Sequence, residues 1–406
     1  MIGKILNFIL FFLYLSNIQF TLMPDRIRTR LIVGVIGFFY YFFRFGGKDY
    51  YKVGKVVQLI IPLALWMFFS IALNTQSQFW FLQYVALQLI YAVGAVFVIH
   101  TGKLYEFSRL LWMVAIYVII QDVVAFVTFQ IPSLSLLLYT FQVPELSADR
   151  ADDLLRLRAI GIGEFGLFGG GMWVAIGLLS LTMLYRMKKI GGIVYMGVFI
   201  ALLITGLFVA RTSLTGLLAL GALVVPLQKN WHKVLGWAVG GGIFLLLLPA
   251  VERSLEEKGF ETYYAFELFD KYRETGRLQS NSYDITTEMW KTLPTETSTW
   301  LIGDAKYEDE RGGYYMHTDV GYLRVLFYGG IIGLLLYLLY IFKVVRLTYR
   351  RSGRNYDEKI FLTIYYLLVV FWMWKGHYDT TFLIYLFLFS ATLNQKIQRK
   401  NQILAR

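Results

Sequence analysis

Arginines at the boundaries of apolar segments are the residues of this chain that could most directly do chemistry. Four stand out, three near predicted membrane boundaries and one in the longest polar loop: Arg158, Arg211, Arg277 and Arg324. A cation at membrane depth is costly and usually lines a polar cavity. Guanidinium groups match phosphate oxygens with paired hydrogen bonds, so converging arginines would suit a lipid diphosphate. The alternative for each one is snorkelling to lipid headgroups, or pairing with Glu164 or Asp319.

Histidine is the second candidate for chemistry, because the chain has only four. His317 opens the segment His-Thr-Asp-Val-Gly-Tyr, directly before an apolar run. A histidine beside Asp319 is a candidate general base, since the reference pKa of imidazole lies near 6.5. His377, in Lys-Gly-His-Tyr-Asp, is a weaker competitor. The alternative is that His317 is an ordinary polar residue at the interface.

The glycine spacing and the absence of cysteine argue against a dinucleotide site and against cysteine-based sites. Gly161, Gly163 and Gly166 meet the Gly-x-Gly-x-x-Gly spacing, but no strand precedes them and an apolar run follows. We therefore expect close helix packing or a backbone break there, not a dinucleotide site. Gly329 and Gly333 predict a second packing face. With no cysteine, the chain has no disulfide, no thiol nucleophile and no cysteine-bound metal. We predict no metal site.

The elements that position these residues are apolar helices. The chain has 406 residues, of which 57% are hydrophobic and 16% charged, against roughly 25% charged in soluble domains. Apolar runs of about 15–24 residues recur, which is the length that crosses a bilayer. The sequence therefore predicts an all-α polytopic membrane protein with about twelve transmembrane helices and one long external loop. The expected spans are 5–23, 30–45, 56–73, 79–99, 110–130, 162–185, 190–209, 213–226, 233–250, 319–342, 359–374 and 380–396.

Loop charges predict how the chain is organised and oriented. Lys and Arg concentrate in alternate loops, which favours both termini inside and the long loop outside. The three arginines of residues 26–30 dissent from this pattern. Within the long loop, 252–274 predicts an amphipathic helix, and the basic run 343–354 predicts a topology anchor. The expected parts are helices 1–5 (1–130), an external loop (131–161), helices 6–9 (162–250), the long loop (251–318), and helices 10–12 with the tail (319–406).

From about residue 150 to 345 the chain resembles the bacterial O-antigen polymerase (Wzy-type) and O-antigen ligase superfamily. The resemblance rests on an ordered set of motifs: Ala-Arg211-Thr, Gly276-Arg277, Gly303, His317, Gly321-Tyr322-Leu323 and Gly329-Gly330-Ile-Ile-Gly333. Arg158 and Gly169 also fit an Arg-x10-Gly pattern of these polymerases. The chain departs from the family pattern in two places. Thr318-Asp319 follow the histidine where the family often has Asn, and Arg211 reaches Gly221 one position short of a second such pattern.

The resemblance implies a GT-C-like, metal-independent, inverting glycosyltransferase at the periplasmic face of the bacterial inner membrane, without a cofactor. The donor would be a glycan on undecaprenyl diphosphate, and the acceptor a hydroxyl of another lipid-linked repeat unit. Membrane lipids and a chain-length regulator protein are the other expected partners, and nucleic acid is not one. The expected catalytic residues are His317 as base with Arg211 and Arg277 as the diphosphate clamp. The expected substrate-binding residues are Arg158, Arg324, Asp319, Glu164 and Tyr322, with Asp319 orienting His317.

Three alternatives stay open at this point. Ligation of the glycan to lipid A-core would use much the same site. A lipid-linked oligosaccharide flippase or other transporter would also need arginines for a diphosphate, although it would more often show repeated halves with charges in both. A non-enzymatic membrane scaffold or receptor is the third class. The concentration of charge after residue 150 favours the polymerase.

Overall fold

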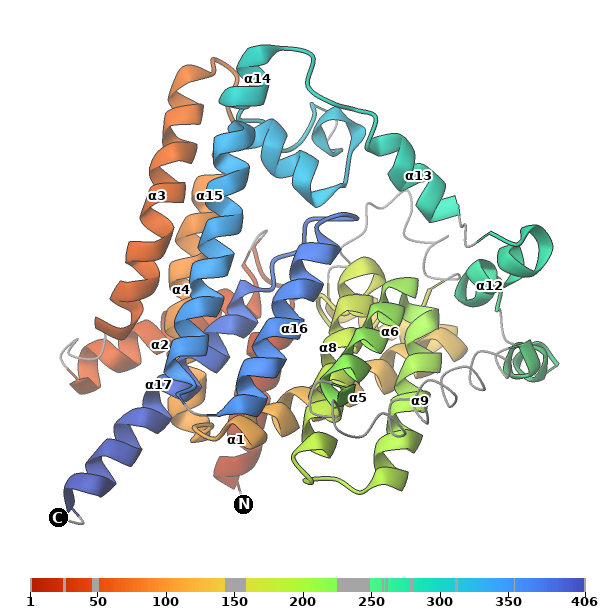
Figure 1. The fold of residues 1–406 in the computed structure, drawn as a ribbon, viewed down its shortest axis with the longest axis horizontal. Coiled ribbons are helices and arrows are strands. Elements are labelled where there is room, and N and C mark those ends of the chain that lie inside the picture. Colours follow the sequence, from red (N-terminus) through yellow and green to blue (C-terminus); the bar gives the residue numbers. More distant parts are fainter. Residues whose placement is uncertain are drawn as a thin grey trace. The chain divides into compact units, whose positions relative to one another are not determined.

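The computed structural model describes residues 2–24, 27–45, 51–142, 158–224, 249–257, 259, 262–277, 281–310, 313–353 and 355–404. Within these ranges the chain is helical, and extended pairing is limited to the isolated bridges Phe20–Gln142 and Glu308–Tyr314. It divides into two compact units (Figure 1). We call Met1–Asn17, Ile27–Leu110 and Asn281–Arg406 the terminal unit, and Ile18–Arg26 with Leu111–Ser280 the central unit. The all-α prediction is confirmed for the described residues.

Among the described residues, six helices are long and apolar enough to cross a membrane. They are Val53–Leu73, Trp80–Gly102, Phe107–Gln130, Leu167–Arg186, Gly192–Val209 and Gly321–Arg351, and two shorter apolar helices are Gly3–Ser16 and Thr29–Phe43. These helices support a membrane-embedded protein, while the full set of about twelve stays a prediction. The expected span 213–226 takes a different form, because residues 211–220 are a 3-10 helix. Most of the expected span 233–250 lies outside the described residues.

The terminal unit is built from helices of both chain ends. Its longer helices are α1 (Ile2–Ser16), α2 (Thr29–Phe45), α3 (Tyr51–Leu73), α4 (Trp80–Gly102), α15 (Gly321–Arg351), α16 (Tyr356–Trp372) and α17 (Thr381–Leu404), with α13 (Asn281–Met289), α14 (Thr297–Leu301) and the 3-10 turn η3 (Tyr315–His317) between them. Arg30 is buried, donates from Nε to the Tyr14 carbonyl at 2.9 Å, and lies over the Phe382 ring. Arg30 is therefore a core residue. Its burial explains one of the three arginines in residues 26–30 that do not fit the loop-charge pattern.

Glycines fix α15 against its neighbours. Gly330 has φ +66°, and a Cβ there would lie 2.2 Å from the Leu301 carbonyl oxygen. The C-terminal end of α14 therefore lies directly on a kink in α15, where only glycine fits. A Cβ on Gly329 or Gly333 would meet the side chain of Met67 on α3 at 2.6 or 3.0 Å. The predicted packing face is thus confirmed for these two glycines.

The central unit packs a 3-10 helix against a glycine-rich helix. Its elements are most of α5 (Phe107–Gln130), α6 (Pro132–Phe141), α8 (Leu167–Arg186), α9 (Gly192–Val209), η1 (Arg211–Leu220), α10 (Gly221–Val224) and α12 (Tyr263–Thr275). α6 occupies the start of the expected loop 131–161. A Cβ on Gly171 would lie 2.9 Å from the Ala210 side chain, and one on Gly216 would lie 2.4 Å from Leu178. Because glycine has no side chain, Gly171 and Gly216 let η1 approach α8 closely, as expected for small residues in helix packing.

The expected amphipathic helix 252–274 is broken in two. Residues 249–256 are helical, Gly259 adopts φ +80°, and α12 begins at Tyr263. Gly259 lies between the two helices in the left-handed conformation. The Thr262 hydroxyl, just before α12, donates to the Glu256 carboxylate at 2.7 Å. α12 then ends at Gly276, which takes the left-handed conformation typical of a helix C-terminus.

Candidate functional site

Arg211 and Glu267 form a buried ion pair in the central unit. Arg211 opens η1 directly after Ala210, whose extended backbone ends α9. Its Nη1 lies 2.6 Å from Glu267 Oε2 on α12, and the two side chains are only 11% and 2% exposed. Lys271, one helical turn further on, lies 3.6 Å from the other oxygen of the same carboxylate. A charge-assisted pair this close and this buried is held firmly in place.

Arg158 adds a second guanidinium to this pair. It lies 5.4 Å from the centroid of the Tyr264 ring, within cation–π range. Burial lowers the pKa of Arg158 to about 10, and the positive charge of Arg211 acts in the same direction. Its Nη1 is buried and has no hydrogen-bond partner among the residues that the structure describes. We call Arg158, Arg211, Glu267 and Lys271 the arginine cluster; these four side chains comprise three cations and one carboxylate.

Two glutamines hold the loop that carries Arg158. Gln121 on α5 accepts a hydrogen bond from the Ile162 N–H at 2.8 Å, and Gln142 accepts one from the Gly163 N–H at 2.8 Å. The Ala159 N–H donates to the Phe208 carbonyl at the end of α9, at 3.0 Å. Glu164 is buried in the same loop. The glycine-rich stretch is therefore a fixed backbone break that places Arg158 beside α9.

Arg277 stands apart from the arginine cluster. It is exposed, one residue past the left-handed Gly276 that ends α12. Its backbone N–H donates to the Thr275 hydroxyl at 3.3 Å, and within the described residues its guanidinium has no ion pair. The structure therefore joins Arg158 to Arg211 but does not join Arg277 to them. The sequence predicts a clamp of Arg211 and Arg277, whereas the structure brings Arg211 together with Arg158.

His317 lies on the surface of the terminal unit. Its side chain is 89% exposed, and its Nδ1 lies 3.9 Å from Asp309 Oδ2. Asp319 Oδ1 is buried and has no hydrogen-bond partner among the described residues, so no bond from it to His317 is found there. Burial raises the pKa of Asp319, against the opposing charges of Lys375 and Arg324. Asp309, and not Asp319, is thus the carboxylate next to the expected base.

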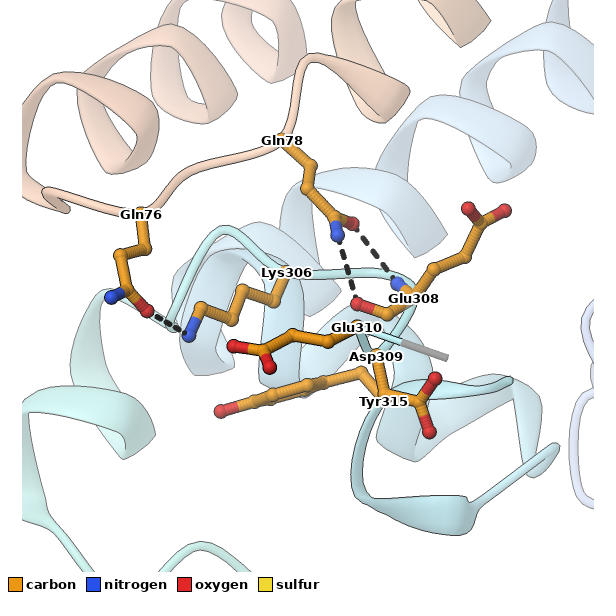
Figure 2. Close-up of a pocket in the computed structure, with 7 residues that line it drawn as sticks. All are labelled: Gln76, Gln78, Lys306, Glu308, Asp309, Glu310 and Tyr315. Carbon is orange, nitrogen blue, oxygen red and sulfur yellow. Dashed lines mark hydrogen bonds between the residues drawn. The ribbon is translucent and has the colours of Figure 1, made fainter. Parts of the chain in front are cut away.

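A polar pocket of about 310 Å³ lies next to this histidine, with Asp309 in its wall (Figure 2). Gln78 fixes the pocket, because its amide donates to the Glu308 carbonyl at 2.8 Å and accepts from the Glu308 N–H at 3.0 Å. Gln76 accepts from Lys306 at 2.8 Å. The remaining lining residues are Glu310 and Tyr315. Amide, carboxylate and hydroxyl groups in a concave site are suited to a ligand rich in hydroxyls.

Arg324 and Tyr322 are both engaged within the terminal unit. The Arg324 guanidinium lies between two rings, 3.7 Å from the Tyr307 centroid and 4.0 Å from that of Tyr314. Its Nε is buried without a hydrogen-bond partner. The Tyr322 hydroxyl donates to the Val370 carbonyl at 2.7 Å. Arg324 is therefore held by aromatic faces, and the Tyr322 hydroxyl is used in packing α15 against α16.

Sequence reasoning missed a buried polar network in the terminal unit. His377 is enclosed between two hydroxyls, with Nδ1 2.9 Å from Tyr307 and Nε2 3.0 Å from Tyr337. Asp379 accepts from Gln88 Nε2 at 2.5 Å and from the Thr381 N–H at 2.9 Å. Burial lowers the pKa of His377 to about 3, with Arg324 acting in the same direction, and burial raises the pKa of Asp379. We call His377, Asp379 and these four partners the buried network.

His377 is therefore neutral at ordinary pH, and both its ring nitrogens already have partners. The spacing His377-Tyr378-Asp379 at the start of an apolar run was the available signal. It could not show that Gln88, far away in the sequence, supplies the amide that meets the carboxylate.

Comparisons of the chain with protein-family models, with curated proteins and with solved structures found no match. Within the described residues, no three His, Asp or Glu side chains gather as a possible metal site.

Proposed function

We propose that the chain is a membrane glycosyltransferase of the O-antigen polymerase type. It would join glycan repeat units carried on undecaprenyl diphosphate, at the periplasmic face of the bacterial inner membrane. One observation carries the proposal: Arg158 and Arg211 lie in one largely buried cluster, where Arg211 pairs with Glu267 and the charges of both act on Arg158. These are two of the arginines that the family resemblance singles out, and they lie far apart in the sequence.

The arginine cluster fits the leaving group of this reaction. When the bond between the anomeric carbon and the diphosphate oxygen breaks, negative charge gathers on the diphosphate. The unpaired Nη1 of Arg158 and the guanidinium of Arg211 would stabilise that charge, each contact contributing about 1.5–3 kcal/mol. Arg211 would share its hydrogen bonds between Glu267 and the phosphate. Arg277, exposed past the end of α12, is the proposed third contact, and the ring-stacked Arg324 remains a second choice.

The acceptor would be activated at the polar pocket of the terminal unit. His317 would take the proton from the acceptor hydroxyl, whose oxygen then attacks the anomeric carbon opposite the departing diphosphate, so that the configuration inverts. Asp309, whose Oδ2 lies 3.9 Å from His317 Nδ1, is the carboxylate that would orient the imidazole ring. The amides and carboxylates of the pocket would hold sugar hydroxyls. Asp319, Glu164 and Tyr322 would act by shaping the loops around the two sites.

Deleting the gene and separating the lipopolysaccharide on a gel tests this function. Core carrying a single repeat is the result expected for a polymerase. Bare core with long lipid-linked chains would instead assign the ligase, and bare core with lipid-linked units on the cytoplasmic side would assign a flippase. An unchanged pattern would end the proposal for lipopolysaccharide, and the same test would then be applied to capsule and exopolysaccharide.

Complementation with His317→Ala tests the proposed base. We expect turnover to fall by about 10²–10⁴ while donor binding persists, because the arginine cluster is untouched. His317 is almost fully exposed, so the substitution should not disturb folding. Near-normal polymer from His317→Ala would remove it as the base. Activity that disappears in chelator and returns with magnesium would contradict the metal-independent mechanism.

A further inference from the structure

Two helices of the terminal unit present basic side chains to one shared groove. Lys343, Arg346, Leu347 and Arg350 of α15 line it together with Lys55, Gln58 and Leu59 of α3, around a volume of about 360 Å³. The α15 positions follow the spacing i, i+3, i+4, i+7, and the α3 positions follow i, i+3, i+4. This is the spacing that places residues on one helical face. We call these seven residues the basic groove.

The groove is a fixed concavity, because the two helices that form it are packed together. Gly329 and Gly333 of α15 contact Met67 of α3, so the helices approach closely. Leu59 and Leu347 give the groove an apolar part between its charged side chains. The shape therefore comes from the helix pair and does not depend on the conformation of a loop.

Among the residues that the structure describes, no acidic side chain lines the groove, and its four cations are exposed. None of them forms an ion pair with a residue that the structure describes, whereas Arg211 and Arg273 of the central unit are each paired with a carboxylate. Like charges placed side by side repel each other. A set of four therefore favours an anion brought from outside the chain.

The position of the groove indicates where that anion comes from. Lys55 lies two residues inside one candidate membrane span, and the three α15 cations lie in the last third of another, Gly321–Arg351. Ends of membrane-crossing helices meet the lipid headgroups, and basic sites between such helices bind phosphate-bearing headgroups. The apolar side chains of the groove suit the first carbons of a lipid better than they suit a free ion.

We propose that the basic groove binds the headgroup of an anionic phospholipid, with its phosphate oxygens on Lys55, Lys343, Arg346 and Arg350. Four cations match a headgroup with two phosphates better than one with a single phosphate. The site is independent of the glycosyltransferase proposal, because it uses none of the same residues. It also gives the basic run of α15 a specific ligand in addition to a role in topology.

Native mass spectrometry of the purified full chain, titrated with defined lipids, tests the proposal. We expect cardiolipin to be retained most, phosphatidylglycerol less, and phosphatidylcholine least. The variant Arg346→Gln/Arg350→Gln should weaken cardiolipin binding about 30-fold, and Lys55→Gln, on the other helix, about fivefold. The matched control is Arg351→Gln/Lys359→Gln, which removes the same charge from neighbouring positions that do not line the groove. It should change binding by less than about twofold.

Each other outcome overturns the proposal. An equal loss in the control would mean diffuse attraction to basic residues. Inorganic pyrophosphate competing as strongly as cardiolipin would assign the groove to a soluble anion, and equal retention of phosphatidylcholine would show that the charges do not select the ligand. A thermal melt accompanies each variant, and the exposed Lys55→Gln decides the case if the α15 double variant is unstable.

Discussion

The arginine cluster of the central unit and the buried network of the terminal unit are both polar sites in an apolar protein, yet they differ in how their groups are satisfied. In the buried network, His377 and Asp379 have close partners on both sides. In the arginine cluster, Arg211 and Lys271 share the Glu267 carboxylate, and Arg158 Nη1 is buried with no hydrogen-bond partner among the described residues.

This difference separates a structural role from a binding role. A satisfied buried network stabilises one arrangement of the chain, and losing one member leaves the others unpaired. A buried cation without its hydrogen bonds instead costs free energy, which a ligand of opposite charge recovers. We therefore expect substitutions in the buried network to change stability and those in the arginine cluster to change function.

Of the substitutions within these two polar sites, Arg211→Ala is expected to have the largest effect on polymer synthesis. Removing one charge-assisted contact to a diphosphate should lower activity by about tenfold to 150-fold, affecting donor binding and turnover together. The assay is polymer formed by purified protein from a lipid-linked repeat unit. Arg273→Ala is the matched control, because Arg273 pairs with Glu252 but is 42% exposed, and exposed pairs contribute little. If both variants lose equal activity, the cluster is not a selective site.

The buried network should respond in the opposite way to Asp379→Ala. Gln88 and the Thr381 backbone N–H would lose their acceptor, which should lower the free energy of unfolding by about 1.5–3 kcal/mol. Chemical denaturation in detergent measures this loss. Activity per folded molecule should stay within about threefold of the wild type. A folded Asp379→Ala protein that is inactive would place the network in the mechanism and remove the contrast.

The same contrast shows what the sequence could predict. Hydrophobic periodicity predicted the α-helices, and the resemblance singled out Arg158 and Arg211 before their proximity was known. The sequence could not predict the partners of these arginines, because Glu267 meets Arg211 only through the packing of α12. Asp319 was expected beside His317 from sequence distance alone, but the left-handed turn at Met316 and His317 directs the histidine toward Asp309. Local pattern predicts the elements, whereas tertiary packing decides which charges meet.

A pH series on His377→Gln sharpens the structural side of the comparison. The pKa of His377 is about 3 in the folded protein and near 6.5 when unfolded. Its contribution is therefore complete above pH 6.5 and is lost as the pH falls toward 3. Between pH 7 and pH 5, the wild type should lose about 2 kcal/mol more unfolding free energy than the variant.

The groups that face His377 do not disturb this pH test, because Arg324, Tyr307 and Tyr337 are present in both proteins and drop out of the difference. Asp379, whose pKa is raised, gives a slope of the opposite sign, but it is present in both proteins and drops out of the difference. Identical pH slopes in the two proteins would mean that His377 is not buried in its neutral form.

Lys271→Gln should have the smallest effect, and it asks whether the arginine cluster acts by geometry or by net charge. Lys271 lies 3.6 Å from Glu267 and is 28% exposed, so its contribution is screened, about 0.2–1 kcal/mol. We expect a loss of activity below about fivefold, against tenfold or more for Arg211→Ala. Arg211→Lys completes the test, because it keeps the charge but not the two-pronged hydrogen bonding of guanidinium. If Arg211→Lys stays active while Lys271→Gln is as impaired as Arg211→Ala, positive charge alone is sufficient. The opposite ranking would show that the paired hydrogen bonds of arginine recognise the ligand.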